Sequence, residues 1–281
     1  MSFSTINGHR LHYEVLPAAG VRPGEPRETL VLIHGMLFDN LSSFYFTVAP
    51  AFAEAGFDVI MFDHRGHGKS KKIESGYQLH NVVDDLAALL DEIHDGTPVH
   101  VIGNSYGGTL AFSFALRYPE RVATMTSIDA EPPTKSWLKM IDDGMAEAMR
   151  VIDKPEVQSD FQAQWGQQGM RLGRAAKKIL DDTRFMYEMT DTPAVADDAI
   201  ANLDMPVLAF YGSESEAFKL EPLIRELVPI NKTVVAQGIG HMVLMDVPEL
   251  VETEVISWVR EHPAAEIVAR RAHAQVPENS I

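Results

Sequence analysis

The chain of 281 residues contains no cysteine. Catalysis by a thiolate, disulfide bonds and metal sites with thiolate ligands are therefore all excluded. Basic residues are also scarce, because 24 lysines and arginines stand against 40 aspartates and glutamates, which gives a formal net charge of −16. A negative charge of this size argues against nucleic acid or an anionic membrane as the main partner.

Long apolar segments are missing as well. No apolar run approaches the roughly 20 residues that a membrane span needs. Residues 1–15 alternate polar and apolar side chains and lack the basic flank and apolar core of a signal peptide. The expectation is a cytoplasmic protein without a membrane partner, and a homo-oligomer is compatible with the sequence. Apolar residues make up 46% of the chain, enough for a substantial core.

The order of apolar segments predicts an α/β fold. Asn7-Gly8 joins two alternating segments, which favours an N-terminal β-hairpin. Short apolar runs typical of buried strands then alternate with helical patterns. Strands are expected at 29–35, 57–63, 98–103 and 122–128, and helices at 43–55, 81–94 and 106–117. This alternation predicts a mainly parallel, doubly wound sheet whose functional residues lie at the carboxyl ends of its strands.

The alternation stops between residues 132 and 203, where the chain becomes helical, charged and rich in methionine. We expect an inserted helical cap. Its tryptophans and methionines could form an adaptable apolar pocket, and they are Trp137, Trp165, Met140, Met145, Met149, Met170, Met186 and Met189. The sheet pattern resumes with a strand at 206–212, a helix at 217–227, a strand at 232–237 and a helix at 248–262. The predicted division is a core of residues 1–131 and 204–263, a cap of residues 132–203 and a C-terminal tail of residues 264–281. Asp246 and Glu249 predict a capping box for the last core helix.

The segment VIGNSYGG at 101–108 carries the clearest chemical signal. It places Ser105 in a G-x-S-x-G pattern between a predicted strand and a predicted helix, as in a nucleophile elbow. A serine on such a sharp turn is exposed, and the N–H of Tyr106 at the helix start can stabilise a developing oxyanion. The segment LIHGM at 32–36 ends the neighbouring strand, so the N–H of Met36 is the expected second oxyanion donor.

Four motifs in this order make the chain resemble the α/β-hydrolases with a helical cap. They are His34-Gly35, DHRGHGKS at 63–70, GNSYGG at 103–108 and GIGHMVLMDVPELV at 238–251, and the resemblance covers residues 3–262. It implies a structural role for the DHRGHGKS turn, and therefore no catalytic role for His64 or His67. It also implies that His241, in the family's histidine loop, is the general base for Ser105.

The acid that would orient His241 is left open by the sequence. In most relatives it lies three residues beyond the glycine that ends the strand at 206–212, and here that position is Ser215. Glu214 and Glu216 flank Ser215. Because neighbouring side chains in an extended loop point to opposite sides, neither glutamate takes the expected place without a local shift of the backbone. Asp129, at the end of the preceding strand, resembles the acid of certain haloalkane dehalogenases and zearalenone-type lactone hydrolases. Asp129 is the favoured candidate, with Glu216 and then Glu214 as alternatives.

The resemblance implies a serine hydrolase that needs no cofactor or metal and cleaves an ester, lactone or thioester with an apolar or aromatic acyl group. A serine nucleophile argues against dehalogenase and epoxide-hydrolase chemistry, which use aspartate in this fold. One alternative is carbon–carbon hydrolysis of the meta-cleavage-product type, whose elbow is similar to GNSYGG. Against it, those relatives usually have tryptophan where Met242 follows His241. The other alternative is a hydrolase-fold protein that binds a ligand without turnover.

Overall fold

The computed structural model describes residues 1–22, 25, 27–151 and 154–274. Within them, eight strands form one sheet in the order β1-β2-β4-β3-β5-β6-β7-β8. The two N-terminal pairings are antiparallel and all the others are parallel, so the predicted mainly parallel sheet is confirmed. The strands are β1 (Ser2–Ile6), β2 (His9–Leu16), β3 (Thr29–Ile33), β4 (Asp58–Phe62), β5 (Val99–Asn104), β6 (Val122–Ile128), β7 (Val207–Gly212) and β8 (Asn231–Ala236).

The predicted N-terminal hairpin is present. Ile6 pairs with His9, and the two residues between them have positive φ angles, 48° for Asn7 and 83° for Gly8. Two positive φ values define the type I′ turn, whose twist matches that of the strands it joins. The Asn7 side chain also donates a hydrogen bond to Asp85 on the next helix layer, which ties the hairpin to the body of the fold.

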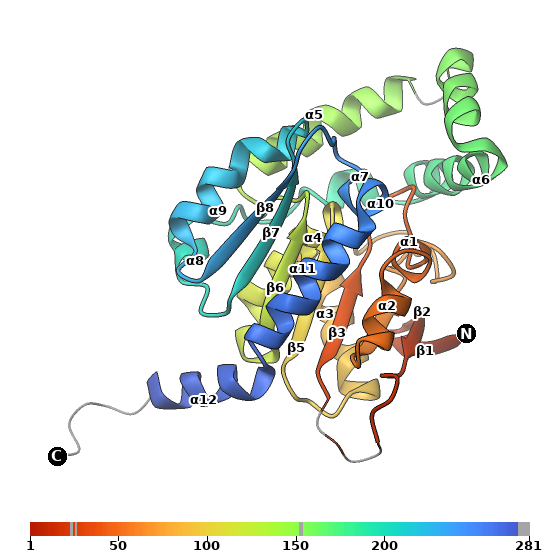
Figure 1. The fold of residues 1–281 in the computed structure, drawn as a ribbon. Helices are drawn as coiled ribbons and strands as arrows, with labels where there is room; N and C mark the ends of the chain where they lie inside the picture. The colour runs from red at the N-terminus through yellow and green to blue at the C-terminus, as the bar shows by residue number, and fades with distance from the viewer. Residues whose placement is uncertain (23–24, 26, 152–153, 275–281) are drawn as a thin grey trace.

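Helices cover both faces of the sheet (Figure 1). The helices of one face, α3 and α4, lie behind the sheet in this view, and α2 and α11 lie in front. The helices outside the segment between β6 and β7 are α1 (Ser42–Tyr45), α2 (Ala49–Glu54), α3 (Leu79–Ile93), α4 (Tyr106–Arg117), α9 (Glu221–Leu227), α10 (Val243–Asp246), α11 (Pro248–Glu261) and α12 (Ala264–Ala274). Short 3₁₀ turns occur at Pro119–Arg121 and Glu216–Leu220.

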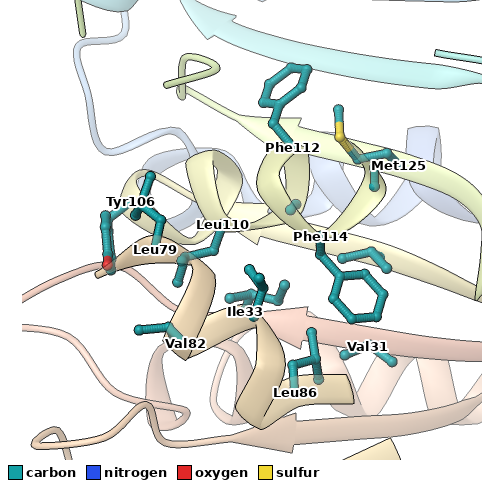
Figure 2. Close-up of a cluster of buried hydrophobic side chains, with 14 of the residues drawn as sticks. Val31, Ile33, Leu79, Val82, Leu86, Tyr106, Leu110, Phe112, Phe114 and Met125 are labelled. Atoms are coloured by element: carbon teal, nitrogen blue, oxygen red, sulfur yellow. The ribbon is translucent and has the colours of Figure 1, made fainter. Parts of the chain in front are cut away.

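The core beneath α4 fixes where that helix begins. Figure 2 shows Val31 and Ile33 of β3 among side chains of α3 and α4, including Leu86, Leu110 and Phe114. All of these side chains are almost completely buried. Each contributes about 1.5–3 kcal/mol relative to an exposed position. This packing holds the N-terminus of α4, and with it Ser105, at the carboxyl edge of the sheet.

The segment between β6 and β7 is helical, as the sequence predicts. Its helices are α5 (Lys135–Val151), α6 (Pro155–Asp182), α7 (Phe185–Glu188) and α8 (Asp197–Ala201), and α6 bends at Gly166. Figure 1 shows α5 and α6 extending beyond the carboxyl edge of the sheet. Met189 is fully buried, whereas Met140 is 41% exposed, so the methionines here do not form one surface. The side chains of Met145, Met149 and Trp165 lie outside the described residues.

Some local predictions differ from the structure. The single helix expected at 43–55 is two short helices, with Pro50 in the first turn of the second. The capping box predicted at Asp246 is wrong, because Asp246 ends α10 and Val247 precedes α11 without a side-chain cap. Pro248 occupies the first turn of α11, where a residue without an N–H leaves one donor fewer to be capped.

Beyond α11, the predicted C-terminal tail begins as a helix, α12, which covers residues 264–274. Ile267 on α12 is 3% exposed, and Arg271 forms a bidentate ion pair with Asp204. These contacts dock the helix against the core. Among the described residues, no helix combines the length and the apolar character that crossing a membrane requires.

Candidate active site

Ser105 lies on a strained turn between β5 and α4. Its φ and ψ angles are 55° and −125°, a conformation that costs a non-glycine residue about 1–3 kcal/mol. The turn needs glycine on both sides. A Cβ on Gly107 would lie 1.9 Å from the carbonyl oxygen of Ile33, and one on Gly103 would lie 2.1 Å from the carbonyl oxygen of Gly107. The G-x-S-x-G pattern is therefore a steric requirement of this turn.

Asp129 follows β6 and lies beside Ser105 because of the strand register. Asn104 of β5 pairs with Ile128 of β6, and the N–H of Ser105 donates to the carbonyl of Ile128 over 2.9 Å. The N–H of Asp129 in turn donates to the carbonyl of Phe210 on β7 over 2.8 Å. Asp129 is 2% exposed and has a φ of 47°. A residue with a hydroxyl group and a residue with a carboxyl group thus occupy strained backbone positions at the carboxyl ends of two neighbouring strands.

His241 connects these two residues. Its Nε2 lies 2.9 Å from Oγ of Ser105, and its Nδ1 lies 2.6 Å from Oδ2 of Asp129. The other carboxylate oxygen of Asp129 accepts a hydrogen bond from the N–H of Gly212 over 2.9 Å. The imidazole is 53% exposed, whereas the Asp129 side chain is fully buried. A base with one nitrogen on a hydroxyl and the other on a carboxylate can move a proton to and from that hydroxyl.

Among the described residues, neither alternative acid forms a hydrogen bond or an ion pair with His241. Both Glu214 and Glu216 are exposed at the rim, and Glu216 pairs with Lys219 on the same turn. Ser215 stands between them and donates its hydroxyl to Oδ2 of Asp129 over 2.5 Å. At the position that the family resemblance gives to the acid, this chain has a serine that donates a hydrogen bond to Asp129.

The loop after β3 presents the N–H of Met36 next to Ser105. The N–H of Gly35 donates to Oδ2 of Asp39 over 2.7 Å, and that of Leu37 donates to Nε2 of His67 over 2.9 Å. Between them, the N–H of Met36 has no acceptor among the described residues, and the same holds for Tyr106 in the first turn of α4. Both residues line the cavity that contains Ser105. Leu37 has a φ of 58°, so this loop is also strained.

Asp39 was not singled out in the sequence, although its place four residues after Gly35 in a loop that follows a buried strand is a usable signal. Its carboxylate accepts hydrogen bonds from the N–H groups of Gly35 and Asn40. Burial raises the pKa of Asp39 above its usual range. This residue holds the loop in the shape that leaves the Met36 N–H uncommitted.

Three buried histidines support the same loop from below. Nε2–H of His64 donates to the carbonyl of His34 over 2.7 Å, and the rings of the two residues lie 3.9 Å apart. Burial holds the pKa of His34 and of His64 well below the ordinary value and lowers the pKa of His67 to about 4. All three are therefore neutral. Their hydrogen bonds are with the loop backbone, as the structural role expected for the DHRGHGKS turn requires.

A cavity of about 420 Å³ opens beside Ser105. Trp137, Met140 and Ile141 of α5 give it an apolar wall, and Glu131 and Thr109 also line it. Glu131 was not among the residues that the sequence singled out. It lies two positions after Asp129, and burial together with the charge of Asp129 raises its pKa to about 7. The volume suits a small-molecule ligand.

Comparison with known proteins gives the family. Residues 28–194 match the family model described as the alpha/beta hydrolase fold. The chain is an α/β-hydrolase. A bifunctional esterase/perhydrolase of Acinetobacter calcoaceticus is 24% identical to this α/β-hydrolase over 239 residues, which are 74% of this chain and 84% of the relative. The esterase of Exiguobacterium antarcticum superposes with a TM-score of 0.73 at 17% identity, over 92% of this chain and 99% of that one, a likeness of fold.

A shorter match has higher identity. The 2-hydroxy-6-oxononadienedioate/2-hydroxy-6-oxononatrienedioate hydrolase of Burkholderia vietnamiensis is 41% identical over 105 residues, which are 36% of this α/β-hydrolase and 36% of the relative. The chain thus spans about a third of the length of that relative. Esterases and a dienedioate hydrolase therefore both stand among the proteins that this α/β-hydrolase is similar to.

Proposed function

We propose that this α/β-hydrolase is a serine hydrolase that cleaves an ester, lactone or thioester through an acyl-enzyme. The observation that carries the proposal is the pair of contacts of His241, with Nε2 at 2.9 Å from Ser105 Oγ and Nδ1 at 2.6 Å from Asp129 Oδ2. Serine alone is a weak nucleophile at neutral pH, and an adjacent, oriented base is what activates it.

Each residue then has one task. His241 takes the proton of Ser105 as Oγ attacks the carbonyl carbon, and returns it to the leaving group. Asp129 accepts the hydrogen bond from Nδ1–H, which fixes the tautomer and stabilises the imidazolium. The N–H groups of Met36 and Tyr106 stabilise the oxyanion, and the N-terminus of α4 adds its dipole. Water activated by His241 then hydrolyses the acyl-enzyme.

Residues 132–203 serve as the cap in this proposal. The support is that Trp137, Met140 and Ile141 of α5 line the same cavity as Ser105. An apolar wall contributed by the cap favours an apolar or aromatic acyl compound as the substrate, because burying such a group releases water from both surfaces.

Carbon–carbon hydrolysis is a second candidate. The 41% identity with the dienedioate hydrolase over 105 residues favours it. Against it, the residue after His241 is Met242, whose side chain is 39% exposed. Position 242 therefore places no aromatic ring over the base. The same serine, histidine and aspartate would serve either reaction, and the two differ in the substrate that is turned over.

The test is hydrolysis of 4-nitrophenyl acetate and butanoate, a thioester, a γ-lactone and a 2-hydroxy-6-oxo-dienoate by wild type, Ser105→Ala and Ser113→Ala. Ser113 lies on the same helix, donates to the carbonyl of Thr109, and does not line the cavity. Ser105→Ala should lose on the order of 10⁶-fold in kcat. Ser113→Ala should retain activity. A fluorophosphonate probe should add to the wild type and not to Ser105→Ala, as judged by intact mass.

Three results would contradict the proposal. Activity that survives in folded Ser105→Ala removes the serine from the mechanism. Turnover of the dienoate with no turnover of any ester, lactone or thioester favours the carbon–carbon reaction. Tight ligand binding without turnover or labelling favours a binding protein of the same fold.

A further inference from the structure

The cavity beside Ser105 is acidic. Its lining includes four carboxylates, Asp129, Glu131, Glu214 and Glu216, and none of its described lining residues is lysine or arginine. In the sequence, the positions whose side chains the structure does not describe also hold no lysine or arginine. A cavity with this balance disfavours an anionic group, because like charges repel most strongly where water is excluded.

Glu131 differs from the other three carboxylates. The side chain of Asp129 bonds Gly212, Ser215 and His241, and Glu214 and Glu216 are exposed at the rim. Glu131 is 6% exposed and lines the cavity, yet its carboxyl group has no hydrogen bond or ion pair among the described residues. Its backbone is held, because its carbonyl accepts the hydroxyl of Thr109 over 2.7 Å. The unpaired group is therefore presented to the cavity on a fixed backbone.

A buried carboxyl group without a partner is costly to the folded protein. A ligand that supplies a positive charge would remove this cost on binding. Trp137 of α5 lines the same cavity and is 3% exposed, so it adds apolar surface to the cavity. An unpaired carboxylate in a cavity with an apolar wall binds ammonium groups by charge attraction, and the wall can cover their alkyl groups.

We propose that Glu131 is a specificity residue that binds a cationic, ammonium-type group of the substrate, and that the enzyme prefers such esters to neutral isosteres and disfavours anionic ones. This inference rests on the proposed ester hydrolysis. It places Glu131 in contact with a part of the substrate that does not react, whereas Ser105, His241 and Asp129 act on the carbonyl.

The test uses substrates matched in shape. On the acyl side they are the 4-nitrophenyl esters of 4-(trimethylammonio)butanoate, 5,5-dimethylhexanoate and glutarate, which are cationic, neutral and anionic. On the leaving-group side they are acetylthiocholine, 3,3-dimethylbutyl thioacetate and S-acetyl-3-mercaptopropionate. We expect the cationic member of at least one series to exceed its neutral isostere by about tenfold or more in kcat/KM at pH 8.5. The anionic member should fall below both.

Variants assign the effect to one residue. In Glu131→Gln the ratio of cationic to neutral kcat/KM should fall to about one, and because the ratio is taken within each variant, a general loss of activity cancels. Glu214→Gln and Glu216→Gln remove a carboxylate from the rim and should keep most of the preference. A wild-type ratio at or below one in both series overturns the proposal, as does an equal loss of preference in all three variants.

The wild type alone gives an independent readout. Burial and the charge of Asp129 raise the pKa of Glu131 to about 7, so Glu131 ionises as the pH rises through that value. The cationic-to-neutral ratio should therefore rise between pH 6 and pH 8.5. The other titratable groups of the cavity are Tyr106, Asp129, Glu214, Glu216 and His241, with Tyr211 near Glu131. The proton transfer by His241 enters both members of a pair and cancels in the ratio. A rise caused by the charge of another group of the cavity would persist in Glu131→Gln, whereas a rise caused by Glu131 is lost there.

Failure of the hydrolase proposal gives a different result. If no ester of either series is hydrolysed and the fluorophosphonate does not label Ser105, the hydrolase proposal is overturned. The Glu131 proposal is then decided by calorimetric dissociation constants for acetylthiocholine and its neutral isostere. Tighter binding of the cation by the wild type, lost in Glu131→Gln, supports it, and equal affinities overturn it.

Discussion

The hydroxyl of Ser215 donates a hydrogen bond to Oδ2 of Asp129 over 2.5 Å. The same oxygen lies 2.6 Å from Nδ1 of His241. The loop after β7, where the family resemblance places the acid, therefore contributes a hydrogen-bond donor to the carboxylate at the end of β6, which is the acid of the proposed mechanism. Hydrogen bonds to a charged acceptor are about twice as strong as neutral ones, so this contact helps to hold the buried carboxylate in place.

Asp129→Asn should lower kcat by about 10³- to 10⁴-fold, because an amide at this position no longer holds His241 in the required tautomer. Glu214→Gln and Glu216→Gln serve as matched controls, since both glutamates are exposed and neither has a hydrogen bond or ion pair with His241 among the described residues. Their kcat should stay within a few-fold of the wild type. Steady-state hydrolysis of a 4-nitrophenyl ester measures all three. A large loss in Glu216→Gln with near-normal activity in Asp129→Asn would transfer the role to Glu216.

Exchanging the two side chains tests whether the acid can move. Because Ser215 Oγ lies close to the oxygen that faces His241, a carboxylate at position 215 should reach Nδ1. The double variant Asp129→Ser/Ser215→Asp should therefore recover at least about tenfold in kcat over Asp129→Ser alone, a part of what the orienting acid supplies. Single Ser215→Asp should lose activity, since it places two carboxylates side by side. Equal kcat in the double and single Asp129 variants would count against this geometry.

The DHRGHGKS turn should be important for stability. Asp85 of α3 is 1% exposed and bonds Arg65 of that turn at 2.7 Å, as well as His9 and Asn7 of the hairpin. Asp85→Ala leaves the Arg65 charge buried and unpaired, which should cost about 3–5 kcal/mol. At this chain length Tm should fall by on the order of 10 °C in calorimetry.

The control for Asp85 is Asp91 on the same helix. Asp91 pairs with Arg121 at 2.9 Å, but its side chain is 70% exposed. An exposed pair is worth about 0–1 kcal/mol, so Asp91→Ala should change Tm by only a few degrees at most. Similar Tm values for the two variants would show that the buried cluster does not stabilise the fold as proposed.

Stability should decline in mild acid because of the buried histidines. Burial lowers the pKa of His67 to about 4 in the folded chain, against an ordinary value of 6.5 when unfolded. The unfolded chain therefore binds more protons than the folded chain in this pH range. The stability that the neutral His67 contributes is fully present above pH 6.5 and is lost as the pH falls toward 4. His67 alone accounts for about 3 kcal/mol at the acid end. His34 and His64 shift in the same direction.

Urea unfolding at pH 7.5, 6.0 and 5.0 measures this decline. Carboxylates whose pKa is lowered by partners, such as Asp84, change the free energy of unfolding only at a pH near or below their ordinary pKa of about 4. Glu131 and Asp39, whose pKa values are raised, act in the opposite direction, so a net decline between pH 6.5 and 5 belongs to the histidines. His67→Leu should be less stable at pH 7.5, because Leu37 loses an acceptor, and should show a shallower slope. A free energy of unfolding that stays constant from pH 7.5 to 5.0 would contradict the prediction.

Much of the fold could be predicted from local pattern. The strand at 122–128 and the helix at 106–117 have the predicted bounds. Both were predictable because the spacing of apolar residues within a short segment indicates which side chains a strand or a helix buries. The capping box at Asp246 was wrong for the converse reason. The chain forms the extra turn α10 there, and its shape is set by packing of Val243 and Leu244 into the core.

By itself the sequence determined the parallel sheet, the elbow at Ser105 and the histidine loop at His241, since each has a signature within a few residues. Only the tertiary structure decided which carboxylate lies beside His241. Asp129 and His241 are 112 residues apart, and the ladder from β6 through β7 to β8 brings them together. The unpaired state of Glu131 was decided in the same way, because the absence of a partner depends on every element that surrounds the cavity.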